Sequence, residues 1–156
     1  MIKVILWIIL SFVAIALQST LFKGPRPDLL LILVCFYALK HDVLSSLLFG
    51  AISGLILDVS NGFIVGSAVI SKAITGYVVV SVKQIIYGWG IVIHFFIIFI
   101  SAVIDYFIFL IFLNTFNPLS NYYRPLESIF MDIAYTTFFG LLLFPFVKRI
   151  YFEKQL

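Results

Sequence analysis

Three charged residues, Lys72, Asp105 and Asp132, fall within long apolar stretches of the sequence. An unpaired charge at the centre of a bilayer costs roughly 2.5–3.5 kcal/mol, and such residues often form proton relays, ion paths or substrate sites. The other interpretation is a structural ion pair that fixes how neighbouring helices pack. Because transporters usually carry more polar linings and broken helices, and the other polar residues here are mostly Ser and Thr, the sequence favours the structural interpretation.

The three charges are expected to lie close together in depth. Lys72 is at the centre of the apolar segment 63–82, and Asp105 is about four residues outward of the centre of segment 89–113. If these segments are antiparallel helices, the two side chains differ in depth by about 6 Å, within reach of an extended lysine. Asp132 falls at nearly the same depth as Asp105. The sequence therefore predicts a buried cluster of Lys72 with Asp105, Asp132 or both.

Catalytic and metal-binding motifs are not recognisable in the sequence. Cys35, His41 and His94 do not stand at metal-ligand spacing with one another or with a carboxylate. The sequence also lacks a nucleophile elbow and a phosphate-binding glycine loop. His94 is expected to be a packing residue and His41 a turn residue. We expect no cofactor, no metal and no enzymatic activity, including activity on lipids.

The composition requires a membrane around these residues. Of 156 residues, 63% are hydrophobic and 11% are charged, and the mean hydropathy is +1.21. A soluble domain has about 25% charged and 45–50% apolar residues. The net charge of +3 is too small and dispersed to indicate nucleic-acid binding. We therefore expect an all-α, polytopic membrane protein with one integral membrane domain over residues 1–156.

Six apolar segments are expected to be helices: residues 2–21, 29–39, 43–57, 63–82, 89–113 and 126–147. A full crossing usually needs about 17–25 residues. Segments 29–39 and 43–57 are shorter than that, so they are predicted to be either tilted helices sunk within the protein or a re-entrant pair.

The distribution of Lys and Arg predicts the orientation, because cytoplasmic loops carry an excess of both. With six segments and a cytoplasmic N-terminus, the C-terminus is cytoplasmic too. The cytoplasmic side then receives six basic residues (Lys3, Lys40, Lys83, Lys148, Arg149 and Lys154), against three outside (Lys23, Arg26 and Arg124).

Glycines recur between residues 50 and 66, at Gly50, Gly54, Gly62 and Gly66, with Asp58 among them. Glycines four residues apart share one face of a helix and let another backbone approach closely, which is how helices associate in lipid. A carboxylate in such a place must end a span or face the protein interior. The pattern predicts a tightly packed helical hairpin that turns over residues 58–62.

The order of these features resembles the rod shape-determining protein MreD family. The resemblance rests on the runs RPDLLLILVCFYAL, GAISGLILDVSNGFIVG and SKAITGY. In that family a Pro-Asp entry opens a short helix, a glycine-rich helix leads to Asp, and a small-residue turn and a glycine follow. The matching positions are Pro27, Asp28, Gly50, Gly54, Asp58, Gly62 and Gly66.

The resemblance implies a component of the bacterial cell-elongation machinery in the inner membrane. Its implied partners are MreC, the filament protein MreB, and the transglycosylase and transpeptidase that extend peptidoglycan. The glycine-lined faces would either pack internally or accept the transmembrane helix of MreC. The sequence leaves self-association open.

The family's fold is similar to the six-helix substrate-binding subunits of energy-coupling-factor vitamin transporters, and such a subunit is the alternative function. Those subunits usually carry Ala-x-x-x-Ala in the first helix. Here the corresponding pairs are Ser11 with Ile15, Ala14 with Gln18, and Ala16 with Thr20, which argues against the alternative.

Overall fold

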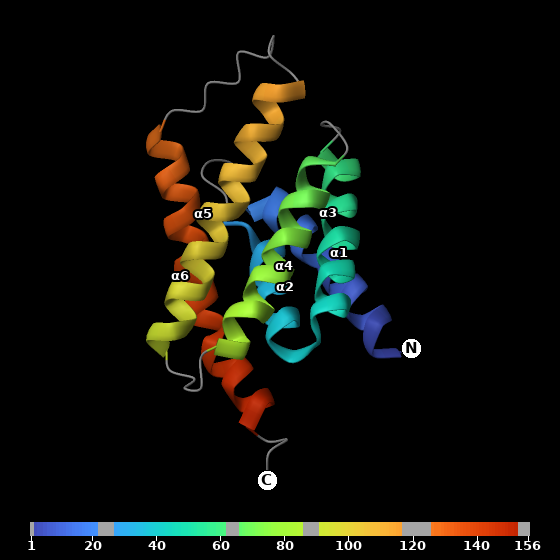
Figure 1. Cartoon of the computed structure of the whole chain (residues 1–156), viewed down its shortest axis with the longest axis vertical. Coiled ribbons are helices and arrows are strands. Elements are labelled where there is room, and N and C mark those ends of the chain that lie inside the picture. The colour runs from blue at the N-terminus through green and yellow to red at the C-terminus, as the bar shows by residue number, and fades with distance from the viewer. Residues whose placement is uncertain (1, 22–26, 62–65, 86–90, 117–125, 153–156) are drawn as a thin grey trace.

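The computed structural model describes residues 2–21, 27–61, 66–85, 91–116 and 126–152. These residues form six α-helices: α1 (Ile2–Leu21), α2 (Leu29–Lys40), α3 (Val43–Asn61), α4 (Ser67–Ile85), α5 (Ile91–Phe116) and α6 (Leu126–Phe152). Successive helices alternate in direction, and the start of α1 and the end of α6 both lie in the lower half of Figure 1. The predicted all-α class is confirmed.

Four of these helices are long and apolar enough to cross a membrane, over Val43–Ser60, Ser67–Ile85, Ile91–Phe112 and Glu127–Pro145. The described apolar parts of α1 and α2, Leu6–Thr20 and Leu29–Lys40, are shorter. The prediction of a short third segment was wrong, because α3 continues past Leu57 to Asn61 and has 19 residues. Six complete crossings and the likeness to vitamin-transporter subunits stay predictions.

The short helix α2 lies at the centre of the bundle and contacts each of the other five described helices. Nine of its 12 residues are buried. A helix that is apolar on every side is stable only when protein or lipid covers every side. Here protein does so: Leu31, Cys35, Ala38 and Leu39 pack against residues of α4 and α5. The short second segment is therefore sunk within the protein, one of the two arrangements predicted for it.

Aromatic contacts join α1 to this centre. The Trp7 ring meets Tyr37 of α2 edge-on at 5.3 Å between centroids and Phe49 of α3 at 6.0 Å. Tyr37 and Phe49 stack at 4.2 Å. Edge-to-face and offset-stacked pairs are the favourable arrangements of such rings, so Trp7 anchors the first helix to the second and third.

The outer surface of the bundle is apolar. Large hydrophobic side chains are exposed along each of the helices around α2, for example Leu44 on α3, Phe107 on α5 and Phe130 on α6. An apolar surface of this extent is stable when it faces acyl chains, which agrees with the membrane location predicted from composition.

Helices α3 and α4 lie side by side (Figure 1) and approach closely in a regular register. A Cβ atom added to Gly50 would overlap the carbonyl of Lys72, and one added to Gly54 would overlap the carbonyl of Ala68. On α4, a Cβ at Gly76 would lie 2.6 Å from the Ser46 carbonyl oxygen. Each contact steps four residues along both helices, so one face of α3 follows one face of α4.

We predict that Gly54→Ala destabilises the protein, because its methyl group meets main-chain atoms that cannot turn aside. Overpacking of this kind lowers the free energy of unfolding by about 1–3 kcal/mol. Unfolding of the detergent-solubilised protein, followed by circular dichroism, measures this change.

The matched control is Gly140→Ala on α6. There the added Cβ would meet the Ile98 side chain, with Cδ1 at 2.5 Å. That side chain can rotate, and the higher helix propensity of alanine, about 1 kcal/mol, offsets the contact. Equal losses for the two variants would contradict the close α3–α4 packing.

Candidate functional site

Lys72 on α4 is the centre of the buried polar site. It is 1% exposed, and its ammonium group donates hydrogen bonds to Asp28 and Asp105, the latter at 2.8 Å. Both contacts are ion pairs, one to the start of α2 and one to α5. An ammonium group removed from water is stable only when paired and hydrogen-bonded, and these two carboxylates meet that requirement.

Asp28 connects this ion pair to two further elements. It is the N-cap of α2, where its Oδ1 accepts a hydrogen bond from the Leu31 amide at 2.9 Å. Its own amide donates to Thr136 Oγ1 on α6 at 2.9 Å, and that hydroxyl donates to the Asp132 carbonyl at 2.7 Å. We call Lys72, Asp28, Asp105 and Thr136 the charge node. It joins α2, α4, α5 and α6.

The charge node contains one of the clusters predicted from sequence, Lys72 with Asp105, and adds Asp28. Asp105 is paired with Lys72 as predicted, whereas Asp132 joins the network through its main-chain carbonyl. Pro27 and Asp28 were expected as the Pro-Asp entry to the second helix. Asp28 caps that helix and is also the second ion-pair partner of Lys72, a contact that the sequence did not predict. Pro27 lies just before the cap and is buried.

The charge node holds two carboxylates against one ammonium group. The second carboxylate oxygen of Asp105, Oδ1, is buried and is not used by Lys72. Chemically, such a group could hold a proton as well as join helices. Over the part of the chain that the structure describes, no group of three His, Cys, Asp or Glu side chains is placed to bind a metal ion.

Asp58, on the last turn of α3, caps the start of α4. Its Oδ2 accepts from the Gly66 amide at 2.7 Å, and its Oδ1 accepts from the Ala68 amide at 3.1 Å. The Ser67 hydroxyl and the Val69 amide are further donors to the same carboxylate. A helix N-terminus leaves its first amides without partners and carries a partial positive charge. The Asp58 carboxylate accepts hydrogen bonds from these amides and balances this charge, although it comes from the preceding helix.

Gly66 explains why the cap comes from elsewhere. It precedes α4 and its carbonyl accepts the first helical hydrogen bond, from the Ile70 amide at 3.0 Å. Its φ of +121° is a conformation that side chains disfavour. With glycine at this position there is no local capping side chain, and Asp58 supplies one.

The predicted glycine-lined faces of the third and fourth segments are found in part. Gly50, Gly54 and Asp58 share the α4-facing side of α3, whereas Gly66 belongs to the connection. Gly62 lies outside the described residues. The turn predicted at 58–62 is also wrong in position, because helix α3 continues through Asp58 to Asn61. Gly76 was not predicted to take part in this contact. The signal in the sequence is that it follows Lys72 by four residues and so lies on the same face of α4.

The two histidines are packed against aromatic rings. The His94 ring lies between Phe36 and Phe144, with centroids at 5.8 and 4.6 Å. His41 stacks on Tyr37 at 3.9 Å, and its Nδ1 lies 3.0 Å from the Tyr37 carbonyl oxygen at the end of α2. These contacts agree with a packing residue and a turn residue.

Comparison with protein-family models matches residues 1–151 to the family described as rod shape-determining protein MreD. The match includes every residue of the charge node and of the α3–α4 contact. No curated protein and no solved structure matches the chain.

Removing the Asp58 carboxylate should loosen the α3–α4 hairpin. Loss of a capping side chain costs about 0.5–2 kcal/mol, so we expect Asp58→Ala to lower the free energy of unfolding by that amount or more. Asp58→Asn, which keeps one acceptor oxygen, should lose less. Ser60→Ala, at an exposed position in the same turn whose hydroxyl donates to its own helix at the Ile56 carbonyl, is the control. A loss from Ser60→Ala as large as that from Asp58→Ala would contradict the capping role.

Breaking the charge node at Lys72 should be more costly. Lys72→Met leaves two partly buried carboxylates without a cation, and removal of one partner of a buried pair typically costs about 3–5 kcal/mol. Lys40→Met, at the exposed end of α2, should leave the unfolding transition near that of the wild type.

A compensated variant separates charge imbalance from lost packing. In Lys72→Met/Asp28→Asn/Asp105→Leu the charges are removed together, while the asparagine that replaces Asp28 can still cap α2. Because apolar replacement of a whole buried ion network is often neutral, stability should return to within about 1 kcal/mol of the wild type. A triple variant less stable than Lys72→Met would refute this explanation.

Proposed function

Because the chain belongs to the MreD family of rod shape-determining proteins, we propose that it is a non-enzymatic component of the bacterial cell-elongation machinery. It resides in the inner membrane, with both termini in the cytoplasm. There it holds MreC beside MreB and the peptidoglycan synthases.

The observation that supports a scaffold most directly is that the buried charges form contacts between helices. Asp58 caps α4, and Lys72, Asp28 and Asp105 join α4 to α2 and α5. Each of these groups stabilises a helix or holds two helices together. The charges make the bundle rigid, and a rigid bundle presents a constant surface to a partner.

The partner surface is an outward face of the bundle. Gly50 and Gly54 are already covered by the main chain of α4. Of the two roles expected for the glycine-lined face, it therefore packs inside the bundle and is not open to MreC. The MreC helix therefore packs against outward side chains. Contacts of this kind in lipid depend on close fit and hydrogen bonds, because burial of apolar surface gives no gain there.

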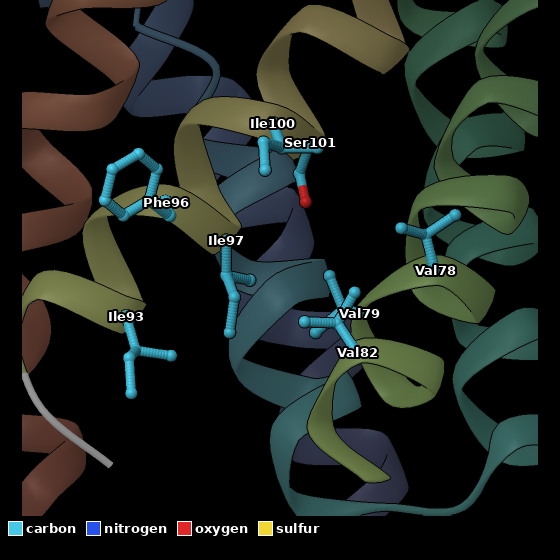
Figure 2. Close-up of a pocket in the computed structure, with 8 residues that line it drawn as sticks. All are labelled: Val78, Val79, Val82, Ile93, Phe96, Ile97, Ile100 and Ser101. Carbon is cyan, nitrogen blue, oxygen red and sulfur yellow. The ribbon is translucent and has the colours of Figure 1, made fainter. Parts of the chain in front are cut away.

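The vitamin-transporter alternative has less support. The groove between α4 and α5 is lined by seven apolar residues and Ser101 (Figure 2). A soluble vitamin needs several placed polar groups for recognition, and this groove offers one hydroxyl.

Site-specific photo-crosslinking in living cells tests the MreC contact. Benzoylphenylalanine at the outward positions Phe12, Phe107 and Phe138 (on α1, α5 and α6 in that order) should give an MreC adduct from at least one of them. The same residue at Val34, which is fully buried in α2, is the control and should give none. Complementation of cells depleted of their own MreD is measured in parallel as the length-to-width ratio.

Two results would contradict the proposal. One is complementation of rod shape by chains that give no MreC adduct from a scan of all outward positions. The other is loss of rod shape in the stable Lys72→Met/Asp28→Asn/Asp105→Leu variant, which would indicate proton or ion chemistry at the charge node. A vitamin retained at stoichiometric occupancy after purification would favour the alternative.

A further inference from the structure

An apolar groove lies on the side of the bundle between the second half of α4 and the first half of α5. Figure 2 shows side chains from both helices facing the space between them, and the Ser101 hydroxyl points into it. The cavity volume is about 260 Å³, and its lining is Val78, Val79, Val82, Ile93, Phe96, Ile97, Ile100 and Ser101.

The groove has a buried floor and an exposed rim. Val79, Ile97 and Ser101 are between 1% and 5% exposed, whereas Phe96 is 54% exposed. The rim continues into the apolar outer surface of α5, where Phe99 and Val103 are exposed. The groove therefore opens on the lateral surface of α4 and α5. In a membrane, that surface faces the acyl chains.

The dimensions fit one hydrocarbon chain. From Ile93 to Ser101 the groove extends for about 12 Å along α5 at 1.5 Å per residue, close to half of a hydrocarbon core about 30 Å thick. A helix with side chains is about 10–12 Å across, so a length of about 12 Å of it would occupy several times the cavity volume of about 260 Å³. A partner helix would thus not enter the groove. An acyl chain would regain the dispersion contacts that an empty groove loses.

A positive charge lies beside the end of the groove at the bilayer surface. Lys83 follows Val82 directly and is in the last turn of α4. The groove runs from this level toward the bilayer centre, so a lipid with one tail in it has its headgroup near the lysine. Basic residues near the membrane surface attract anionic headgroups.

We infer that the α4–α5 groove binds one acyl chain of an anionic phospholipid, from the leaflet at which α4 ends, with the headgroup beside Lys83. A lipid held there fills the space between the end of α4 and the start of α5, which the Lys72–Asp105 ion pair does not reach.

Native mass spectrometry of the detergent-purified full chain tests this inference. The probes are phosphatidylglycerol and phosphatidylethanolamine with identical tails. We expect one phosphatidylglycerol to stay bound at detergent concentrations that remove phosphatidylethanolamine. Val78→Phe, which fills the groove, should weaken this binding at least tenfold. Val92→Phe, at an exposed position of α5 outside the lining, should leave it unchanged.

The headgroup is tested with Lys83→Gln, which should weaken phosphatidylglycerol binding about fivefold through loss of one cationic attraction. Lys40→Gln is its control, because it removes one positive charge from the exposed end of α2, a helix that contributes no residue to the groove lining. Equal affinity for the two lipids, or no effect of Val78→Phe, would overturn the inference. A dimer mass that Val78→Phe abolishes would also overturn it, by assigning the groove to a second copy of the chain.

A second measurement covers the case in which Val78→Phe fails to fold. Phosphatidylglycerol with a diazirine in the middle of one tail is irradiated with the wild-type chain in nanodiscs. The adducts should map to Phe96, Ile97 or Ile100. Adducts spread evenly over Leu44, Phe107 and Phe138, which are exposed but lie outside the groove lining, would refute a specific groove site.

Discussion

The pairing of Lys72 with Asp28 and Asp105 is the interaction on which the arrangement of the helices depends. Apolar packing alone does little to orient helices in lipid, because the acyl chains outside are as apolar as the side chains inside. A buried ammonium group is different, since its partners must lie within hydrogen-bond distance and cannot be replaced by lipid. That requirement places the start of α2, the middle of α5 and the second turn of α4 around one point. Through the Asp28 amide and Thr136, it reaches α6 as well.

The α3–α4 hairpin follows a second constraint: the first main-chain amides of α4 need hydrogen-bond acceptors. Gly50 and Gly54 allow the two helices to approach until carbonyl groups meet the glycine Cα positions. The same face of α3 then carries Asp58 to the first amides of α4. The close contact and the cap support each other, because a bulkier residue at Gly54 would move the carboxylate away from those amides. The positive φ of Gly66 completes the connection. The hairpin also places Lys72, whose main chain lies against Gly50, with its side chain directed toward Asp28 and Asp105.

The proposed scaffold function agrees with the way in which the buried charges link the helices. The buried charges serve as links between helices, α2 is enclosed, and the outward faces are apolar. Such a bundle is suited to present a fixed surface in the membrane, as expected of a member of a shape-determining family. Packing is incomplete at the α4–α5 groove on the lipid-facing side. Along α5, the groove lies between the start of the helix and Asp105. A lipid that fills it would stabilise the two helices that share Lys72 and Asp105.

The sequence by itself determined the membrane environment, the all-α class, the approximate positions of the helices and a buried cluster of Lys72 with Asp105, Asp132 or both. These follow from composition, segment length and depth, which are properties of one segment or of neighbours in the chain. The partnership of Asp28 with Lys72, 44 residues apart, was decided only by the tertiary structure. In the sequence Asp28 is only part of the entry to the second helix, and no local pattern shows which helix its other carboxylate oxygen faces. The end of α3 was misplaced for a similar reason: Asp58 resembles a turn residue until the amides of α4 are beside it. A polar group in lipid takes the partner that the whole bundle brings near, and spacing along the chain does not specify that partner.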